Sequence, residues 1–426
     1  MAAREIRERV KEARVLLIGD EPHSPYLRPP LSKNLWRATE EEAAALTFPS
    51  GTGDGEREVV SVWASGDRED AGLGAVATGV RGHVRSVDAK QRTVELEDGS
   101  EYAYGKLLLA TGARAVSLAH IQPEIADRVL TLRTLDDWRR LRALTRSAGQ
   151  RDTPLRVTVV GGGYLGTELA ASLAQFVPNC RVAQLLNGEL PMEAVFPRPL
   201  ASEVGARLAQ RGVELVPRAH AVGVVQQGRG EGCAVVLQDG ATRESDVVVL
   251  ALGVESDFGL IARSGFEVDD RLGGVVANSE LQVASHVWAA GDVVSYYDAT
   301  VGVRRRTPHA DHAAMSGAHA ARNMMAGGAG GEPYDYLPSE FGSVAGLEWE
   351  GCGLLDARFD TVSLWDREAG AGCERGVVYY LEEGSVVGVL AVNLPGSMDY
   401  AKKLVKYGFA VEEAKELFQL IYLGEK

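Results

Sequence analysis

Buried runs of apolar residues that end at glycine or an acidic residue recur along this chain. The clearest is Leu155 to Val160, whose β-branched and apolar residues predict a strand buried on both faces of a parallel sheet. An apolar-periodic helix is expected from Tyr164 to Phe176. Between them stand Gly161, Gly163 and Gly166, with the spacing G-x-G-x-x-G. This order of strand, glycine turn and helix is typical of a dinucleotide-binding turn.

Each glycine of this turn has its own physical reason. The first permits the tight turn, the second lets the backbone approach a pyrophosphate, and the third lets the helix pack against the strand. The pyrophosphate would then meet the free N–H groups and the positive dipole end of the helix. A glycine-rich turn that binds no ligand is the alternative interpretation.

The next strand indicates which dinucleotide is bound. Arg181 to Leu186 is expected to be a strand, and it ends in Asn187, Gly188 and Glu189. An acidic side chain about twenty residues beyond the glycines accepts a hydrogen bond from the ribose 2′-OH of NAD. No Arg or Lys stands in this stretch to bind a 2′-phosphate, so the sequence favours NADH over NADPH.

Four further strands are expected to end beside a ligand. They are Ala13–Ile18, which ends at Asp20 and Glu21; Lys106–Ala110, which runs into Thr111-Gly112; Val247–Leu252, which reaches Gly253; and Leu281–Ala290, which is followed by Gly291-Asp292. Acidic residues after the second strand of a dinucleotide fold bind an adenosine ribose, the role expected of Asp20 and Glu21. Asp292 could accept a hydrogen bond from a sugar hydroxyl or only cap the following turn.

The remaining pattern completes a chain of alternating strands and helices. Helices are expected at Ala2–Glu12, Leu135–Ser147, Leu200–Arg211 and Ala313–Met325, and strands at Gly82–Asp88, Thr93–Glu97, Leu130–Arg133, Glu214–Pro217 and Ala234–Leu237. Loops or linkers are expected at 50–58, 148–153 and 327–331. The last part of the chain predicts an α+β domain, with strands at Gly353–Leu355, Thr361–Trp365, Val377–Leu381 and Val386–Val392 before a helical tail from Met398.

Two features near the start of the chain stand out. A dinucleotide fold with Asp20 and Glu21 after its second strand should begin with a strand and a glycine loop, yet the sequence opens on a helix. We therefore expect the sequence to be truncated inside the first helix of such a fold. Further on, PYLRPPLSK holds Arg28 and Lys33 on a loop that two prolines stiffen, which suits an anionic or electron-rich ligand. The alternative is a surface turn with incidental charge.

Composition narrows the class of protein. The 426 residues, 45% hydrophobic and 24% charged, predict a soluble globular protein of two or three domains. A net charge of −14 argues against strong binding of nucleic acid, and Arg304 to Arg306 is expected to be a solvated turn or an interface. No apolar run is long enough for a membrane helix, and the acidic residues Glu5, Glu8 and Glu12 argue against a targeting segment.

Candidate metal or redox ligands are sparse. Cys180, Cys233, Cys352 and Cys373 are too scattered for a zinc cluster or a redox-active dithiol, so free thiols are expected. His309, Asp311 and His312 lack a further ligand set, so capping and ligand contact are expected of them rather than metal binding.

These strand ends, flanking one intact nucleotide-binding motif, resemble the flavoproteins in which an NAD domain is inserted into an FAD domain. Within that class the chain resembles the mitochondrial apoptosis-inducing factors, through PYLRPPLSKNLW, GGGYLGTELA, VWAAGDVVSYYD, VRRRTPHADHAAMSG and VVYYLEEGSVVGVLAVN. The fold class implied is α/β, with two Rossmann-like domains and a C-terminal α+β domain. The boundaries implied are 1–128 and 256–328 for the two parts of the FAD-binding domain, 129–255 for the NAD-binding domain, and 329–426 for the α+β domain, which is of the dimerisation type.

The resemblance also implies a site. FAD would be bound by Asp20, Glu21, Arg28, Lys33, Arg133, Asp292 and His309, and NADH by Gly161, Gly163, Tyr164, Leu165, Gly166, Glu168, Gly253, Glu350 and Asn393. In the family a Lys and Glu pair lies beside flavin N5, here Lys33 and Glu168, and could orient the hydride donor and stabilise the reduced flavin. Tyr164 stands where an aromatic ring shields the flavin until nicotinamide displaces it. No thiol is placed to receive electrons, which excludes the disulfide-reductase branch.

The chain departs from the family at several positions. The FAD glycine loop is missing, Pro308 replaces a glutamate, Gly342 replaces a tryptophan, and Glu193 replaces a lysine near the NAD ribose. A long insertion of the family is reduced here to about 366–375. Homodimerisation on reduction, through Glu267 and Arg304, and a mitochondrial import oxidoreductase as partner are implied by the resemblance.

The resulting hypothesis is an FAD-dependent NADH oxidoreductase with roles in mitochondrial respiratory upkeep and apoptosis. It would act in the mitochondrial intermembrane space, with the nucleus in apoptosis; because the chain shows no targeting segment, the cytoplasm is the alternative. Two other functions stay open: a truncated, non-catalytic form that acts through partners, and a ferredoxin- or rubredoxin-type reductase.

Overall fold

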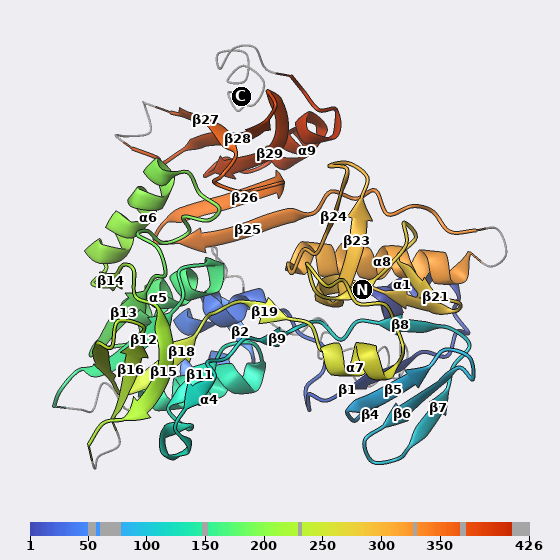
Figure 1. Ribbon diagram of the computed structural model, residues 1–426, viewed down its shortest axis with the longest axis horizontal. Coiled ribbons are helices and arrows are strands. Elements are labelled where there is room, and N and C mark those ends of the chain that lie inside the picture. Colours follow the sequence, from blue (N-terminus) through green and yellow to red (C-terminus); the bar gives the residue numbers. More distant parts are fainter. Residues whose placement is uncertain are drawn as a thin grey trace. The chain divides into compact units, whose positions relative to one another are not determined.

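The computed structural model describes residues 1–49, 57–59, 78–146, 152–228, 232–326, 330–366 and 372–410 (Figure 1). Two units can be distinguished. Unit 1 contains Met1–Leu27, Val59–Arg114 and Val254–Pro338, and unit 2 contains Arg28–Glu58, Ala115–Gly253 and Ser339–Lys426. The four domain boundaries expected from the sequence stay a prediction. Residues 50–56, 147–151, 327–329, 367–371 and 411–426 lie outside the described residues, and with them most of the expected loops, the centre of the shortened insertion and the end of the tail.

A parallel five-stranded sheet positions the glycine turn in unit 2. Its order is β11-β18-β12-β13-β14, and every neighbouring pair is parallel. The strands are β11 (Val129–Thr131), β12 (Leu155–Val160), β13 (Cys180–Leu185), β14 (Glu214–Val216) and β18 (Val247–Leu250), with helices α4 (Leu135–Arg146), α5 (Tyr164–Phe176) and α6 (Arg198–Gln210). Strand order reverses at β12, because β13 lies on one side of it and β18 on the other. Open α/β sheets bind ligands at the carboxyl ends of strands at such a reversal.

A second sheet covers the first in unit 2. Its order is β10-β15-β16-β17, and its strands are β10 (His120–Ile121), β15 (Ala221–Gln226), β16 (Cys233–Leu237) and β17 (Thr242–Ser245). Val224 and Val235 of this sheet lie in one apolar cluster with Val160, Leu185 and Leu250 of the parallel sheet. Burial of these side chains removes apolar area from water and holds the two layers together. The strands β15 and β17 were not expected, because Gly223 interrupts one and the other is polar (TRES).

The last part of unit 2 is an antiparallel sheet with one helix. Its order is β25-β26-β29-β28-β27. Its elements are β25 (Ser339–Val344), β26 (Leu347–Gly353), β27 (Asp360–Trp365), β28 (Gly376–Glu382), β29 (Ser385–Val392) and α9 (Met398–Lys406). The strand expected at Gly353–Leu355 is wrong: β26 ends at Gly353, whose φ of 84° turns the chain. The pair β25 and β26 supplies side chains to the candidate site.

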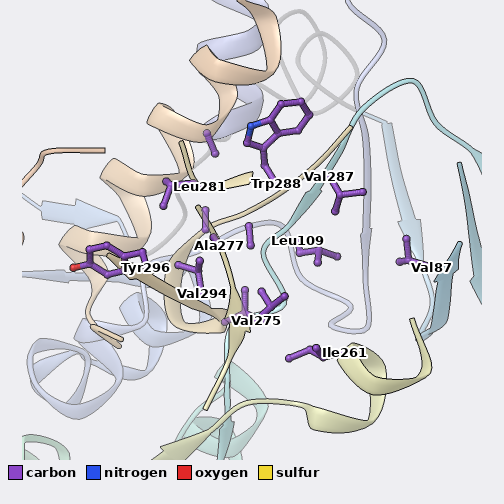
Figure 2. Close-up of a cluster of buried hydrophobic side chains, with 14 of the residues drawn as sticks. Val87, Leu109, Ile261, Val275, Ala277, Leu281, Val287, Trp288, Val294 and Tyr296 are labelled. Carbon is purple, nitrogen blue, oxygen red and sulfur yellow. The ribbon is translucent and has the colours of Figure 1, made fainter. Parts of the chain in front are cut away.

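Unit 1 contains pairs of parallel strands, among them β20 (Val275–Val276) with β23 (Val294–Asp298). Strand β1 (Leu16–Gly19) pairs with β4 (Thr78–Arg81), and β8 (Leu107–Leu109) pairs with β22 (Val287–Ala289). The run Leu281–Ala290 was expected to form one strand, but it forms a hairpin of β21 (Gln282–Ala284) and β22, since His286 has a φ of 64°. Figure 2 shows the apolar core of this unit, where Leu109, Val287 and Val294 lie among other buried side chains.

The remaining described elements of each unit are as follows. In unit 1 they are α1 (Ala2–Arg9), β5 (Val84–Asp88), β6 (Thr93–Leu96), β7 (Glu101–Ala103), α7 (Phe258–Arg263), β20 (Val275–Val276), η6 (Gly291–Val293), β23 (Val294–Asp298), β24 (Val303–Arg305) and α8 (Ala310–Met325). In unit 2 they are η1 (Pro29–Ser32), η2 (Asn34–Arg37), α2 (Glu40–Ala44), β2 (Thr47–Pro49) and η4 (Pro123–Ile125). Strand β3 (Arg57–Val59) pairs with β2, and β9 (Arg114–Ala115) pairs with β19 (Val254–Glu255). No helix among the described residues is long and apolar enough to cross a bilayer.

A buried histidine in unit 1 gives a pH-dependent stability. His312 is fully buried, stacks on Tyr296 and shares a hydrogen bond of 3.1 Å with the hydroxyl of Tyr334. Burial, helped by the positive charge of Arg305, lowers the pKa of His312 from 6.5 to about 3. Below pH 6.5 the unfolded chain therefore binds a proton that the folded chain does not, and stability falls as pH falls.

We expect this one residue to remove about 2 kcal/mol of unfolding free energy between pH 7 and pH 5. Urea denaturation at both pH values, on the natural protein and on His312→Gln, measures the difference. Because glutamine does not titrate, the variant should lose about 2 kcal/mol less than the natural protein over this range. Equal losses in the two proteins would show that His312 is protonated as readily folded as unfolded.

Candidate functional site

The glycine turn of unit 2 has the shape of a dinucleotide cradle. Gly161 has a φ of 127°, and a Cβ there would lie 2.2 Å from the carbonyl oxygen of Ala251. A Cβ on Gly166 would lie 2.2 Å from the carbonyl oxygen of Gly161. A Cβ on Gly163 would meet no atom within 4 Å. The first and third glycines are thus needed by the fold, whereas the second leaves an open side where a pyrophosphate can approach the backbone.

Free backbone donors face this open side. Gly163 is the N-cap of α5, and no side chain in the described part of the chain caps that end of the helix. The first N–H groups of α5 and the positive end of its dipole are therefore available to an anion. Gly253, with a φ of 94°, follows β18 at the same edge of the sheet, since β12 and β18 are parallel neighbours. Leu165 lies in the first turn of α5, directly after Tyr164.

The loop after β13 carries an acidic residue, Glu189, that is paired with two arginines. Glu189 accepts a hydrogen bond of 3.0 Å from Arg198 and another from Arg218. Residues 187–189 contain no Arg or Lys, as the sequence analysis noted, but the fold brings these two arginines to Glu189 from outside that stretch. Glu193, which replaces the family's lysine, accepts hydrogen bonds from the N–H groups of Glu189 (2.9 Å) and Leu190 (3.1 Å) and so caps this loop.

The predicted pair Lys33 and Glu168 is formed within unit 2. Lys33 Nζ lies 2.9 Å from Glu168 Oε1, and the two side chains are 14% and 6% exposed. Ser32 donates a hydrogen bond of 2.9 Å to Oε2 of Glu168, and Ser172 in turn donates one of 2.8 Å to the carbonyl of Ser32. The stiff loop of prolines thus places Ser32 and Lys33 together on one carboxylate of α5.

Burial raises the pKa of Glu168 above its ordinary value, because a carboxylate loses its hydration there. The ammonium of Lys33 opposes this rise first, followed by the hydroxyl of Ser32 and the N–H of Ser343. Burial and these donors therefore act in opposite directions on the pKa of Glu168, and burial has the larger effect.

An aromatic cluster covers the start of α5. Tyr164 lies one helical turn before Glu168; its hydroxyl donates a hydrogen bond of 3.1 Å to Glu340 of β25, and its ring stacks on Trp349 of β26 with centroids 6.1 Å apart. Burial raises the pKa of the Tyr164 phenol well above its ordinary value. Trp349 is 4% exposed, and its indole N–H has no partner among the described residues, so it is a donor available to a ligand.

Gly342, where the family has a tryptophan, has a local explanation. Gly342 and Trp349 are register partners in β25 and β26. A Cβ on Gly342 would lie 2.3 Å from Trp349 and 2.7 Å from Glu168 Oε1. The indole of Trp349 therefore fills the space beside Glu168 that a side chain at 342 would need.

The other predicted residues of unit 2 are placed with different partners. Arg28 donates a hydrogen bond of 2.7 Å to the carbonyl of Arg133, which joins the stiff loop to the end of β11. Asn393 accepts a hydrogen bond of 2.8 Å from the N–H of Glu348 and donates one of 2.7 Å to the carbonyl of Glu374. Its side-chain amide therefore holds the backbone of two neighbouring segments together. Glu350 lies half-buried on β26, one residue after Trp349.

Four predicted residues lie in unit 1. Asp20 and Glu21 follow β1; Asp20 is exposed and 3.8 Å from the ring of His83, and Glu21 accepts a hydrogen bond from Tyr26. Asp292 is buried in η6, next to the start of α8, and His309 caps that helix by accepting a hydrogen bond from the N–H of Asp311. The capping role expected of His309 is confirmed. The two interpretations of Asp292, sugar acceptor or turn cap, both stay open.

The four cysteines are free thiols, as the sequence predicted. All four lie among the described residues and none is in a disulfide. Burial raises the pKa of the Cys180 thiol to about 12 and of the Cys233 thiol to about 11, which disfavours the reactive thiolate. Among the described residues no group of three or more His, Cys, Asp or Glu could hold a metal ion.

Some residues of the site gave no signal in the sequence. Ser32 could have been proposed, because it precedes Lys33 in the stiff loop. Three others could not, because each reaches the site from a distant element and belongs to no local motif: Glu340, Trp349 and Arg218. Arg198 lies only nine residues after Glu189 but belongs to no local motif either.

Comparison with known proteins agrees with this geometry. A family model described as pyridine nucleotide-disulphide oxidoreductase matches residues 1–317. The mitochondrial apoptosis-inducing factor 1 of Dictyostelium discoideum is 31% identical, over 99% of this chain and 78% of its own length. A putative apoptosis-inducing factor 1 of Drosophila melanogaster is 30% identical over 98% of this chain, which spans only 63% of that protein. A monodehydroascorbate reductase of Pisum sativum is 27% identical, over 99% and 94% of the two chains.

Solved structures show the same fold. The putidaredoxin reductase–putidaredoxin complex matches with a TM-score of 0.80 and 22% identity, over 99% of this chain and 96% of that chain. The expected α/β class with two nucleotide-binding domains and a C-terminal α+β domain is confirmed.

Proposed function

The chain belongs to the pyridine nucleotide-disulphide oxidoreductase family, and we propose that it passes a hydride from NADH to FAD. Membership makes it an NAD(P)H-dependent flavoprotein oxidoreductase. The observation that carries the proposal is the pair Lys33–Glu168, whose carboxylate stands on α5 five residues after Gly163, the open glycine of the cradle. A cradle alone binds a nucleotide, whereas a buried cation beside it supports charge transfer.

The residues present fit a nicotinamide dinucleotide, because the open side of Gly163 and the uncapped end of α5 offer donors to a pyrophosphate. Bound FAD would supply the ring that accepts two electrons. Lys33 has three N–H donors and gives one to Glu168, so it can stabilise negative charge on a ligand with another. Glu168 and Ser32 fix that ammonium in place.

Tyr164 is proposed to cover the flavin until nicotinamide displaces it. In the structure its ring is held by Trp349 and its hydroxyl by Glu340. Displacement therefore costs one hydrogen bond and one ring contact, which nicotinamide must replace. FAD binding is proposed for Asp20, Glu21, Arg28, Lys33, Arg133, Asp292 and His309.

Because all four thiols are free and burial raises the pKa of Cys180, Cys233 and Cys373, we expect electrons to bypass them. Replacement of all four cysteines by alanine should leave NADH oxidation within about twofold of the natural rate, since no thiolate takes part. Steady-state rates with a quinone acceptor measure this. Loss of activity in Cys180→Ala alone, in a protein that still carries FAD, would contradict a thiol-free path.

The biological role is proposed from the relatives. Two of them are named mitochondrial apoptosis-inducing factors, which supports a role in apoptosis and a mitochondrial location. A role in respiratory upkeep is proposed by resemblance to that family. The cytoplasm is the alternative location. Dimerisation on reduction is also proposed, through Glu267 and Arg304. Glu267 is exposed and so is accessible to a second copy of the chain. Arg304 donates hydrogen bonds within its own chain, to the carbonyls of Ser295 (2.7 Å) and Ala277 (3.1 Å).

Electron acceptors distinguish the proposed function from its alternatives. The purified protein would be given NADH with a small quinone, an iron–sulfur ferredoxin or the monodehydroascorbate radical. We expect slow turnover with the quinone. Rapid reduction of the ferredoxin would favour a ferredoxin-type reductase. The fold is compatible with that alternative, because the putidaredoxin reductase has a similar fold. A colourless protein that takes up no FAD on refolding would favour the non-catalytic alternative.

A further inference from the structure

Helix α5 presents three polar side chains at intervals of four residues: Tyr164, Glu168 and Ser172. Side chains spaced in this way lie along one face of a helix. The first two belong to the candidate site, whereas the proposed hydride transfer gives Ser172 no part. Ser172 is only 7% exposed, and a buried hydroxyl is costly unless it forms a hydrogen bond. Its partner therefore indicates what it does.

The partner of Ser172 is the main chain of Ser32. The Ser172 hydroxyl donates a hydrogen bond of 2.8 Å to the carbonyl of Ser32, whose own hydroxyl donates one of 2.9 Å to Oε2 of Glu168. Both bonds are buried, and Ser32 is 5% exposed. Helix α5 thus holds Ser32 at two points one turn apart, its main chain through Ser172 and its side chain through Glu168. Two contacts fix both the place and the orientation of a residue.

The hold on Ser32 matters because its carbonyl belongs to the peptide group that joins it to Lys33. That peptide group is hydrogen-bonded at both ends, since its N–H donates to the carbonyl of Pro30 at 3.2 Å. The bond to Pro30 lies within the stiff loop, whereas the bond from Ser172 comes from the helix that carries Glu168. A lysine side chain is a flexible four-carbon stem, so the place of its ammonium depends on where its backbone is held.

We infer that Ser172 is a positioning residue for the proposed hydride transfer, acting through the backbone of Lys33. The inference rests on the proposed function and adds to it a residue outside the pair Lys33–Glu168. Without the Ser172 hydroxyl the carbonyl of Ser32 loses a buried donor, and the loop must move to find another. Such a movement displaces the Lys33 ammonium from the place where it can stabilise charge on a ligand.

Reduction of the FAD-loaded protein by NADH, followed by stopped-flow absorbance, tests the inference. At saturating NADH, Ser172→Ala should reduce the flavin about tenfold more slowly, because a misplaced charged group loses much of its effect. The NADH concentration that gives half the maximal rate should change by less than about twofold, since the glycine cradle is untouched. Ser172→Thr keeps a hydroxyl donor and should restore the rate to within about twofold of the natural one.

The midpoint potential of the bound flavin gives a readout that does not depend on turnover. A positive charge held beside a flavin favours its negatively charged reduced form. Redox titration against a reporter dye should therefore give a more negative potential in Ser172→Ala and the natural potential in Ser172→Thr. A loss of stability alone, in a protein that still binds FAD, predicts neither this shift nor its rescue.

Thr145→Val is the matched control. Thr145 is a buried residue of α4, 3% exposed, whose hydroxyl donates a hydrogen bond of 3.0 Å to the carbonyl of Arg142 in the same helix. Valine removes one buried hydroxyl, as Ser172→Ala does, but far from the loop of Lys33 along the chain. This variant should keep the natural rate of flavin reduction and the natural potential. Thermal unfolding of each variant shows how much stability each has lost.

Two results would overturn the inference and leave the proposed function intact, provided that the natural protein reduces its flavin with NADH. One is a natural rate and potential in folded Ser172→Ala, and the other is an equal loss in Ser172→Ala and Ser172→Thr. If Ser172→Ala does not fold, Ser172→Cys replaces it, because a thiol of similar size is a weak donor; its rate should fall about threefold, and a natural rate would overturn the inference. A natural protein that binds NADH but leaves its flavin oxidised would overturn the proposed function as well.

Discussion

Replacement of Lys33 by methionine is expected to lower the free energy of unfolding by about 3 to 5 kcal/mol. Glu168 is only 6% exposed and depends on Lys33 Nζ, 2.9 Å away, for its compensating charge. Methionine keeps the apolar stem but leaves the carboxylate buried without its cation, and such a charge costs far more than an exposed one. Urea denaturation at pH 7 measures the difference. The same change should abolish flavin reduction by NADH.

Two comparisons separate this cause from ordinary loss of packing. The double variant Lys33→Met, Glu168→Leu has no buried charge to compensate, so it should recover most of the lost stability. In Lys33→Met alone the deficit should shrink as pH is lowered, because burial raises the pKa of Glu168 and protonation removes the charge. A cost below about 1 kcal/mol at pH 7 would mean that solvent reaches the carboxylate.

The second large effect is a loss of NADH binding without loss of stability, and it is expected at only one of two glycines in the same turn. Gly163→Ala should change the free energy of unfolding by no more than about 1 kcal/mol, because a Cβ there meets nothing within 4 Å and φ is −80°. The added methyl group occupies the side on which a pyrophosphate would lie. NADH binding should therefore weaken by more than about tenfold, as the backbone can no longer approach the phosphates.

Gly166→Ala is the contrasting variant. Its Cβ would lie 2.2 Å from the carbonyl oxygen of Gly161, so α5 must move away from β12 at a cost of about 3 kcal/mol. Denaturation curves and NADH titrations of the two variants give both quantities. If Gly163→Ala kept full NADH affinity in a stable protein, the pyrophosphate would not lie on this turn.

The parts of the site that the sequence predicted are those fixed by local residues. The strand Leu155–Val160 and the helix Tyr164–Phe176 have the bounds expected, because β-branched residues, the three glycines and apolar periodicity all act within a few residues. The spacing of Tyr164 and Glu168 by four places them on one face of α5 without any tertiary information.

Pairings between distant elements could not be predicted in this way. Arg218 meets Glu189 because β14 returns beside β13, which tethers residues 188 and 218 to each other. Trp349 reaches Tyr164 through the antiparallel register of β25 and β26, and that register depends on cross-strand packing. The polar positions of β25 (SEFGSV) also gave no clear strand period.

Backbone turns explain the errors in the expected strands. The run Leu281–Ala290 has enough apolar residues for one long strand, yet His286 takes a positive φ and folds it into a hairpin. Histidine is not a strong turn signal, so composition alone favoured the longer strand. The expected strand at Gly353 failed for a related reason, since that glycine ends β26 instead of beginning a strand.

Anaerobic titration of the FAD-loaded protein with NADH tests the central claim most directly. The claim is that the glycine cradle and the pair Lys33–Glu168 together deliver a hydride from NADH to the flavin. About one equivalent of NADH per flavin should remove the visible absorbance of the oxidised flavin, and Lys33→Met with FAD bound should retain that absorbance. A natural protein that binds FAD and NADH but keeps its flavin oxidised in excess NADH would contradict the claim.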